Sequence, residues 1–406
     1  MSDKFLPYSR QCLDEDDLAA VAAVLRSDWL TTGPKVEAFE EALLAEVGAR
    51  FAISCSSGTA ALHLAALAYG LGPGDAVVVP ALTFLASANA ARFVGADVIF
   101  ADVDAEAGLM RETHLRDALA RAGDGKARAV IPVHYAGQCA DAEAIWAVAQ
   151  ENGLAVIEDA CHAIGTTYDI GNAGSATVGD CRASHMAVFS FHPAKTVTMG
   201  EGGAVTTNDE SLARRLRRFR NHGMVRDGDA FENPALAFSA SGKPNPWYYE
   251  MPEVGFNYRA TDIHCALGLS QLGKLARFVD RRRALAARYD ELLRPLAPLV
   301  RPLRRVDGCR PAWHLYVVLV DFEAAGLERA ELMVRLREAG IGTQVHYLPL
   351  HLQPYYRELY GHQELPGAEA FYARILSLPL YPELQDSEVD YIVDTLARIL
   401  DRRTQP

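Results

Sequence analysis

The sequence predicts an α/β fold with a mostly parallel central sheet, followed by a smaller C-terminal α+β unit. Between residues 50 and 210, short Val- and Ile-rich runs alternate with Ala-rich helical stretches, a pattern typical of a parallel sheet covered on both faces. The chain has 406 residues, 50% of them hydrophobic, and a single core rarely extends beyond about 250–300 residues. We therefore expect a large domain over 1–255 and a small one over 256–406.

The expected elements follow in chain order. The strands of the large domain lie in the runs DAVVVPALTF, ADVIFADVD, ARAVIPVHY, GLAVIEDACHA, HMAVFSF and GGAVTT. Segment 224–255 is rich in Gly, Pro, Ser and aromatic residues, which indicates a long irregular insertion of the kind that often carries function. A long helix or helix pair over 260–293 leads to the small domain. There we expect strands over 315–322 and 341–348 and helices over 328–340 and 386–403.

Composition excludes several classes of function. The chain has 52 Asp and Glu against 40 Lys and Arg, so it lacks the basic character of a nucleic-acid-binding protein. Its seven cysteines are scattered without a C-x-x-C pair, as expected for reduced thiols. The sequence shows no signal-peptide core and no apolar run of about 18 residues. We expect a cytoplasmic protein with small-molecule or protein partners and no membrane contact.

Lys195 lies in a loop directly after the run HMAVFSF, within SFHPAKTVTMGEGGAV. A lysine amine becomes a nucleophile toward an aldehyde when a partly apolar pocket or nearby cations favour its neutral form. The crevice at the strand ends of an α/β sheet is where such a group is found. A single lysine is otherwise a solvated surface charge, so this interpretation depends on the other motifs.

A phosphate site is expected where the helix in SCSSGTAALHLAALAYG begins. Ser57, Gly58 and Thr59 offer hydroxyls and backbone N–H groups at the positive helix end, and Gly58 allows close backbone approach. Ser190, five residues before Lys195, adds another hydroxyl. Ordinary N-capping of the helix is the alternative that the local sequence leaves open.

Asp159 stands at the end of the buried run in GLAVIEDACHA. A carboxylate there can pair with the protonated ring nitrogen of a pyridine cofactor and keep the ring electron-withdrawing. A helix cap or a metal site shared with His162 is the alternative, but no further ligand stands at a recognisable spacing, so no metal is expected. Phe84 in PALTFLASANAA can stack on a flat ring, or it is a plain core phenylalanine.

Five ordered motifs resemble the DegT/DnrJ/EryC1/StrS family of sugar-nucleotide aminotransferases along nearly the whole chain. They are SSGTAAL, PALTF, EDACHA, SFHPAKTVTMGEGGAVTT and GFNYRATDIHCALGLSQL. The resemblance implies a fold-type-I transferase that depends on pyridoxal 5'-phosphate (PLP). Related sugar 3-dehydratases carry histidine in place of Lys195, so the lysine favours transamination.

The resemblance also implies roles for single residues. Lys195 would hold PLP as a Schiff base, Asp159 would contact the ring nitrogen and His162 would lie near the ring hydroxyl. Phe84 would cover the ring face. The residues expected around the phosphate are Ser57, Gly58, Thr59 and Ser190. Asn257 of the FNYR segment would reach the cofactor phosphate of a neighbouring subunit, which implies a homodimer with shared active sites.

Within the family, the chain is most similar to the transaminases of pseudaminic acid synthesis. The likeness is carried by PYSRQCLDEDD, DWLTTGPKVEAFE, HGMVRD, PWYYE and QVHYLPLHLQPYY. It implies glutamate as amino donor, UDP-2-acetamido-2,6-dideoxy-β-L-arabino-hexos-4-ulose as acceptor and UDP-4-amino-4,6-dideoxy-N-acetyl-β-L-altrosamine as product. The residues expected on the substrate side are Tyr8, Trp29, Leu30, Thr31, His346 and Tyr347.

Other functions stay open at this point. The acceptor can be another dTDP-, GDP- or UDP-linked keto sugar, aminated at C3 or C4. A non-catalytic regulator that binds PLP is a further alternative, although such proteins usually carry a DNA-binding module and the N-terminal stretch here is short and acidic. A nucleotide-sugar oxidoreductase needs G-x-G-x-x-G after a first strand, and the GEGG cluster at 200–203 lacks that form. The basic runs at 213–226 and 281–283 are interpreted as solvated helix faces.

Overall fold

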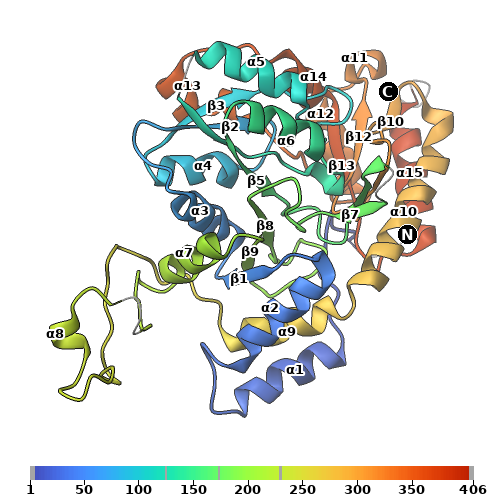
Figure 1. Ribbon diagram of the computed structural model, residues 1–406. Helices are drawn as coiled ribbons and strands as arrows, with labels where there is room; N and C mark the ends of the chain where they lie inside the picture. The colour runs from blue at the N-terminus through green and yellow to red at the C-terminus, as the bar shows by residue number, and fades with distance from the viewer. Residues whose placement is uncertain (1–4, 124–125, 172–173, 228–230, 402–406) are drawn as a thin grey trace.

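A seven-stranded sheet lies at the centre of the computed structural model, which describes residues 5–123, 126–171, 174–227 and 231–401 (Figure 1). The strand order is β1-β9-β8-β5-β4-β2-β3. Only β9 runs against its neighbours β1 and β8, so the predicted mostly parallel sheet is confirmed. Its strands are β1 (Phe51–Cys55), β2 (Ala76–Pro80), β3 (Asp97–Ala101), β4 (Ala127–Val130), β5 (Ala155–Asp159), β8 (Met186–Ser190) and β9 (Gly203–Thr207).

Helices cover both faces of this sheet, and the order of the strands decides which face each helix covers. Helix α4 (Leu85–Phe93) connects β2 to β3, and α5 (Glu112–Ala122) leads back from β3 to β4 in the other direction across the sheet. Because crossovers between parallel strands are right-handed, the two helices lie on opposite faces. The remaining helices packed on the sheet are α2 (Pro34–Val47), α3 (Gly58–Tyr69), α6 (Ala142–Glu151) and α7 (Glu210–Arg220).

At the bottom of the molecule in Figure 1, helix α9 (Asp262–Leu272) packs on both α1 (Glu15–Leu25) and α2. A buried carboxylate ties two of them together, because the Asp262 side chain accepts from the backbone N–H groups of Gly33 and Lys35 at 2.7 and 3.2 Å. These are orphan donors at the start of α2. The first residue of α9 thus caps α2.

The predicted helix pair over 260–293 is confirmed as α9 and α10 (Leu275–Leu293). Helix α10 packs on α15 (Asp386–Leu400), beside a three-stranded antiparallel sheet in the order β10-β12-β13. The other elements here are β10 (Val300–Pro302), β12 (Tyr316–Val320), β13 (Ile375–Leu378), α11 (Phe322–Ala325), α12 (Arg329–Glu338), α13 (Pro354–Tyr360) and α14 (Pro366–Arg374). A small sheet joins β6 (Thr167–Asp169), β7 (Ser175–Thr177) and β11 (Cys309–Arg310). The domain boundary at 255/256 stays a prediction.

The strand expected over 341–348 is wrong. This segment makes isolated bridges at Ile341 and Gln344 only. The third strand of the sheet that contains β10 and β12 is β13 instead. Gln344 exchanges backbone hydrogen bonds with Ser377 of β13, after which the chain leaves the sheet. The carbonyl of His346 accepts a hydrogen bond from the Tyr135 hydroxyl, and this bond directs the segment toward the large sheet.

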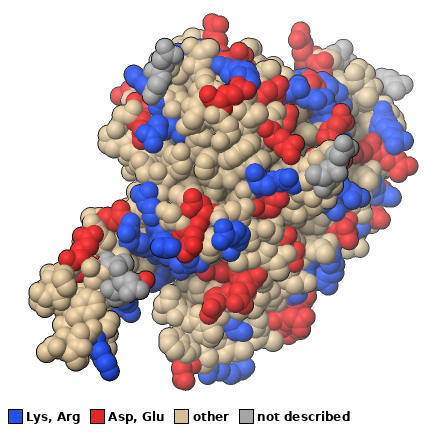
Figure 2. Space-filling view, viewed as in Figure 1, with Lys and Arg blue, Asp and Glu red and all other residues tan. Residues whose placement is uncertain are grey.

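The irregular insertion is confirmed as a projecting segment, residues 224–227 and 231–254, which we call the arm (Figure 1). It contains the short helix α8 (Pro234–Ala237). Backbone hydrogen bonds in both directions between Val225 and Glu250, at 2.8 and 3.0 Å, close its base. The arm is therefore a loop whose two ends are joined at its base. Most of its visible surface carries neither acidic nor basic residues (Figure 2).

On the face shown in Figure 2, acidic and basic side chains are interspersed over the body. The absence of a nucleic-acid partner stays a prediction. Within the part of the chain that the structure describes, no helix has the length and apolar character needed to cross a membrane. The cytoplasmic location stays a prediction.

A core substitution tests the packing of α2 against the segment that follows β8. Phe39 is 0% exposed, and its ring meets that of Phe191 edge-on at 5.2 Å between centroids. We expect Phe39→Ala to lower the free energy of unfolding by about 3–5 kcal/mol, because it leaves a cavity. Urea unfolding followed by circular dichroism measures this change. Val334→Ala, at an exposed position of α12, should change it by less than about 0.5 kcal/mol; equal losses in both variants would contradict the packing described.

Candidate active site

A cavity of about 540 Å³ opens at the carboxyl ends of β5 and β8, beside the start of α3. Open α/β sheets bind ligands at this edge. Eleven of the residues expected at the site line it: Tyr8, Ser57, Gly58, Thr59, Phe84, Asp159, His162, Ser190, Lys195, His346 and Tyr347. The sequence motifs thus converge on one place, although they come from segments far apart in the chain.

Lys195 reaches the cavity from the loop between β8 and β9. Its backbone N–H donates to the carbonyl of His192 at 2.8 Å, and the Ser9 hydroxyl holds the carbonyl of Ala194 at 3.0 Å. Burial lowers the pKa of the Lys195 amine, an effect that Cys161 and Asp159 partly oppose. A larger share of the amine is therefore neutral near pH 7, as a nucleophile or a base requires.

Two hydrogen bonds orient the carboxylate of Asp159, which faces the cavity. The Ser87 hydroxyl donates to Oδ2 at 2.7 Å, and the backbone N–H of Cys161 donates to Oδ1 at 3.1 Å. Thr83 in turn lies 2.8 Å from the Ser87 hydroxyl. These bonds fix the direction of the carboxylate, and each oxygen keeps a further lone pair for a cationic ring N–H.

The start of α3 forms a cradle with the ends of two strands. A Cβ on Gly58 would lie 2.8 Å from the Cβ of Ser190, and a Cβ on Gly203 would lie 2.3 Å from the carbonyl oxygen of Ser57. Only glycine permits these approaches, which place the Ser190 hydroxyl at the positive end of α3. The Ser57 hydroxyl accepts from the backbone N–H of Ala60 at 3.1 Å, so it serves as the N-cap, the alternative that the sequence left open.

The opposite wall of the cavity is polar and uncharged. Burial and the charge of Lys195 lower the pKa of His346 to about 3, and the same two causes put that of His162 well below its usual value. His162 Nδ1 accepts from the N–H of Ala136 at 3.3 Å, so the neutral ring carries its proton on Nε2. That nitrogen lies 3.1 Å from the Tyr347 hydroxyl and donates to it.

Sequence reasoning missed several cavity residues. His314 lines the cavity, and its ring lies 4.4 Å from that of His162 between centroids. It lies two residues before β12, and no motif around it distinguished it from a core residue. The other lining residues that were missed are Leu62, Thr83, Ala86, Val133, Cys161, His192, Ala194, Glu201, Gln344 and Val345.

Arg282 corrects the interpretation of the run at 281–283 as a solvated face. Its side chain is fully buried, and it donates to the carbonyls of Trp313, His314 and Leu380 at 3.1–3.3 Å. Burial lowers the pKa of its guanidinium to about 10. The residue therefore fixes the backbone that presents His314. The charge pattern of the run did not distinguish this buried arginine from its neighbours, because Arg281 and Arg283 do reach acidic partners near the surface.

Four expected site residues lie elsewhere in this chain. Trp29, Leu30 and Thr31 are exposed in the connection between α1 and α2 and do not line the cavity. Asn257 is also exposed, and it forms an isolated bridge with Asn221 at the base of the arm. Their roles toward substrate and cofactor stay predictions.

Comparison with known proteins decides the family. The model of the DegT/DnrJ/EryC1/StrS aminotransferase family matches residues 11–397. The chain belongs to this family. The spore coat polysaccharide biosynthesis protein SpsC of Bacillus subtilis (strain 168) is 40% identical over 399 residues, which are 98% of this chain and 97% of SpsC.

Solved structures agree with this membership. Helicobacter pylori PseC, an aminotransferase of pseudaminic acid biosynthesis, superposes with a TM-score of 0.86 at 30% identity, covering 98% of this chain and 100% of PseC. Spr1654 of Streptococcus pneumoniae, solved in its PLP form, gives 0.85 at 28% identity over 99% and 100% of the two chains. The protein is thus a PLP-dependent sugar aminotransferase with the fold of the type-I enzymes, as the resemblance implied.

The cavity of this DegT/DnrJ/EryC1/StrS member fits PLP on its own geometry. Lys195 offers an amine with a lowered pKa, Asp159 offers an oriented carboxylate, and the cradle at Gly58 leaves the space that a side chain would fill. A lysine, a carboxylate and an anion cradle are the three groups that a pyridoxal cofactor needs. We infer that these residues hold PLP in this chain.

Gly58→Ala tests the cradle. The added Cβ would lie 2.8 Å from Ser190, which should push the start of α3 away from β8 and weaken PLP binding about tenfold or more. Release of PLP from the purified enzyme, followed by its visible absorption, measures the effect. Gly72→Ala is the matched control because the nearest atom to its Cβ would be 4.0 Å away. Unchanged PLP retention in Gly58→Ala would show that the cradle is not the phosphate site.

Proposed function

We propose that the protein transfers an amino group from glutamate to C4 of a UDP-linked 4-keto-6-deoxy sugar. The acceptor is UDP-2-acetamido-2,6-dideoxy-β-L-arabino-hexos-4-ulose, and the product is UDP-4-amino-4,6-dideoxy-N-acetyl-β-L-altrosamine. The observation that carries an aminotransferase function is the juxtaposition of Lys195 and Asp159 in one cavity. The choice of sugar is supported by the likeness to PseC, described as acting in pseudaminic acid biosynthesis.

PLP supplies an aldehyde that condenses with amines and a ring that withdraws electrons from the attached carbon. Lys195 would hold the cofactor between turnovers and, once displaced by the donor, act as the base that removes the proton from the donor α-carbon. Its lowered pKa suits this task, because an effective base is partly neutral at the working pH. Asp159 would keep the ring nitrogen protonated through its oriented carboxylate.

The uncharged wall suits a sugar. Tyr8, His346 and Tyr347 line the cavity and offer hydrogen-bond donors and acceptors without fixed charge, which match sugar hydroxyl, keto and acetamido groups. Among the described lining residues, Lys195 is the only Lys or Arg. The diphosphate of a nucleotide sugar and the carboxylates of glutamate therefore need cations from outside this set.

The exposed surface of the arm favours a homodimer, in which the partner subunit is the source of these cations. The arm exposes large apolar side chains: Leu236, Trp247, Tyr249, Met251 and Val254 are 54–74% exposed. Monomeric proteins rarely leave such a patch uncovered, and a two-fold dimer covers the same surface on both subunits. In this proposal Asn257, at the arm's base, approaches the cofactor of the partner, and the α1–α2 connection with Trp29 and Leu30 borders the shared sites.

Another nucleotide-linked keto sugar is the second candidate acceptor. It is favoured by the 40% identity to SpsC, whose description concerns spore coat polysaccharide rather than pseudaminic acid. A panel of UDP- and dTDP-linked keto sugars with glutamate, with products resolved by NMR, separates the two. Turnover confined to a dTDP-3-keto sugar would contradict the proposed acceptor and leave the aminotransferase assignment intact.

Lys195→Ala tests the catalytic assignment. We expect the visible absorption of the lysine-bound cofactor to disappear and kcat for amino transfer to fall by about 10²–10⁴-fold or more, because the proton-transfer base is lost. Absorption spectra and a coupled assay for 2-oxoglutarate measure both. Lys126→Ala, at an exposed position before β4, should behave as wild type. Normal turnover by Lys195→Ala would disprove the role given to this residue.

Substitutions in the arm test the dimer. Trp247→Asp combined with Met251→Asp introduces charges into its apolar surface, and we expect sedimentation velocity to show a shift from dimer to monomer together with loss of activity. Val334→Asp, at an exposed position of α12, should leave the dimer unchanged. A wild-type protein that is active and monomeric would contradict the shared-site proposal.

A further inference from the structure

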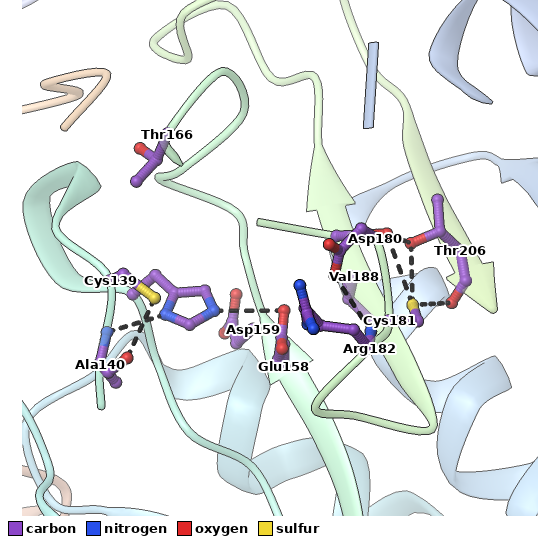
Figure 3. Close-up of polar contacts among 12 residues, drawn as sticks. Cys139, Ala140, Glu158, Asp159, Thr166, Asp180, Cys181, Arg182, Val188 and Thr206 are labelled. Atoms are coloured by element: carbon purple, nitrogen blue, oxygen red, sulfur yellow. Dashed lines mark hydrogen bonds and ion pairs between the residues drawn. The ribbon is translucent and has the colours of Figure 1, made fainter. Parts of the chain in front are cut away.

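Two ionisable side chains lie buried behind the cavity. Glu158 and His134 are 3% and 0% exposed, and neither lines the cavity. Because successive side chains of a strand point to opposite faces, Glu158 of β5 points away from the cavity that Asp159 faces; Figure 3 shows the two carboxylates adjacent on this strand. A buried carboxylate is costly unless it is paired, so Glu158 needs a reason to be there.

His134 is its partner. The Nε2 atom of His134 lies 3.3 Å from Oε2 of Glu158. On the other side of the ring, Nδ1 accepts from the backbone N–H of Ala140 at 3.0 Å. A nitrogen that accepts carries no proton, so the neutral ring directs its N–H toward Glu158. Neither of the two facing atoms has a hydrogen-bond partner among the described residues, so the pair is a close polar contact whose alignment falls short of a hydrogen bond.

His134 begins a loop, residues 134–140, whose backbone contacts the active site. The N–H of His134 donates to the carbonyl of Asp159 at 3.1 Å. Ala136 donates its N–H to His162 at 3.3 Å and accepts at its carbonyl from the N–H of His314 at 3.0 Å. The loop thus touches three residues that line the cavity.

The conformation of this loop requires support from outside. Ala136 has φ of 59°, a left-handed conformation that residues with a Cβ adopt at a cost. Gly137 follows with φ of 99°, and its carbonyl accepts from the Thr166 hydroxyl at 2.7 Å. Strained segments persist only where surrounding contacts determine them. The pair of Glu158 and His134 is one such contact, and it acts at the first residue of the loop.

We propose that Glu158 and His134 are positioning residues for the PLP site. Their pairing fixes loop 134–140 against β5, and the loop in turn fixes the tautomer and orientation of His162 and the place of His314. The inference rests on the proposed role of the cavity in PLP-dependent transfer. A merely structural role would affect stability alone, whereas a positioning role also changes cofactor retention and the ratio of kcat to KM.

Three variants test the pairing. Glu158→Leu removes the carboxylate that faces His134, and we expect PLP to leave the holoenzyme about tenfold faster and kcat to fall about tenfold, with KM for glutamate within about twofold of wild type. Glu158→Gln keeps an acceptor oxygen and should restore both values to within about threefold. Asp180→Asn is the matched control, because it removes a neighbouring partly buried carboxylate (Figure 3) whose side chain accepts from Arg182, outside the loop.

Thermal unfolding accompanies each measurement, and Glu158→Met, of similar length, replaces the leucine variant if the latter does not fold. A lower melting temperature with unchanged PLP release and kcat in Glu158→Leu would overturn the proposal. Equal losses in Glu158→Leu and Glu158→Gln, or in Asp180→Asn, would also overturn it, since charge rather than pairing would then matter. Wild-type enzyme that retains no PLP would instead refute the proposed function itself.

Discussion

The close approach of the first turn of α3 to the ends of β8 and β9 is the constraint on which the site depends. Gly58 and Gly203 permit it, since a Cβ at either position would collide with Ser190 or with the backbone of Ser57. The approach brings a positive helix end, a hydroxyl and the loop of Lys195 to one edge of the sheet. With any larger residue at these two positions, the anion cradle and the lysine would separate.

The antiparallel strand β9 explains why Lys195 stays at that edge. In a purely parallel sheet the chain after β8 would continue into a helix and leave the crevice, because a parallel crossover must return to the far end of the sheet. Here β9 pairs antiparallel with both β8 and β1, so the connecting loop remains beside the carboxyl end of β5. Asp159 and Lys195 therefore meet across neighbouring strands.

Local signals predicted the parts of this structure that depend on local physics. Val- and Ile-rich runs identified the parallel strands, and the ordered motifs placed eleven residues in one cavity. Segment 341–348 was expected as a strand, but tertiary contacts with Ser377 and Tyr135 direct it into the cavity. Arg282 shows the same limit, since no property of an RRR run tells which arginine is covered by carbonyl groups from other segments.

The pKa values of the lysine and the histidines in the cavity are lowered by the same cause, which is burial. Desolvation lowers the pKa of Lys195 and that of His346 alike, but the lysine begins about four units higher and is stabilised by Asp159 and Cys161. The histidines are further disfavoured as cations by the lysine charge itself. Burial therefore leaves His162, His314 and His346 uncharged at neutral pH, whereas Lys195 remains the more basic of the two kinds of group.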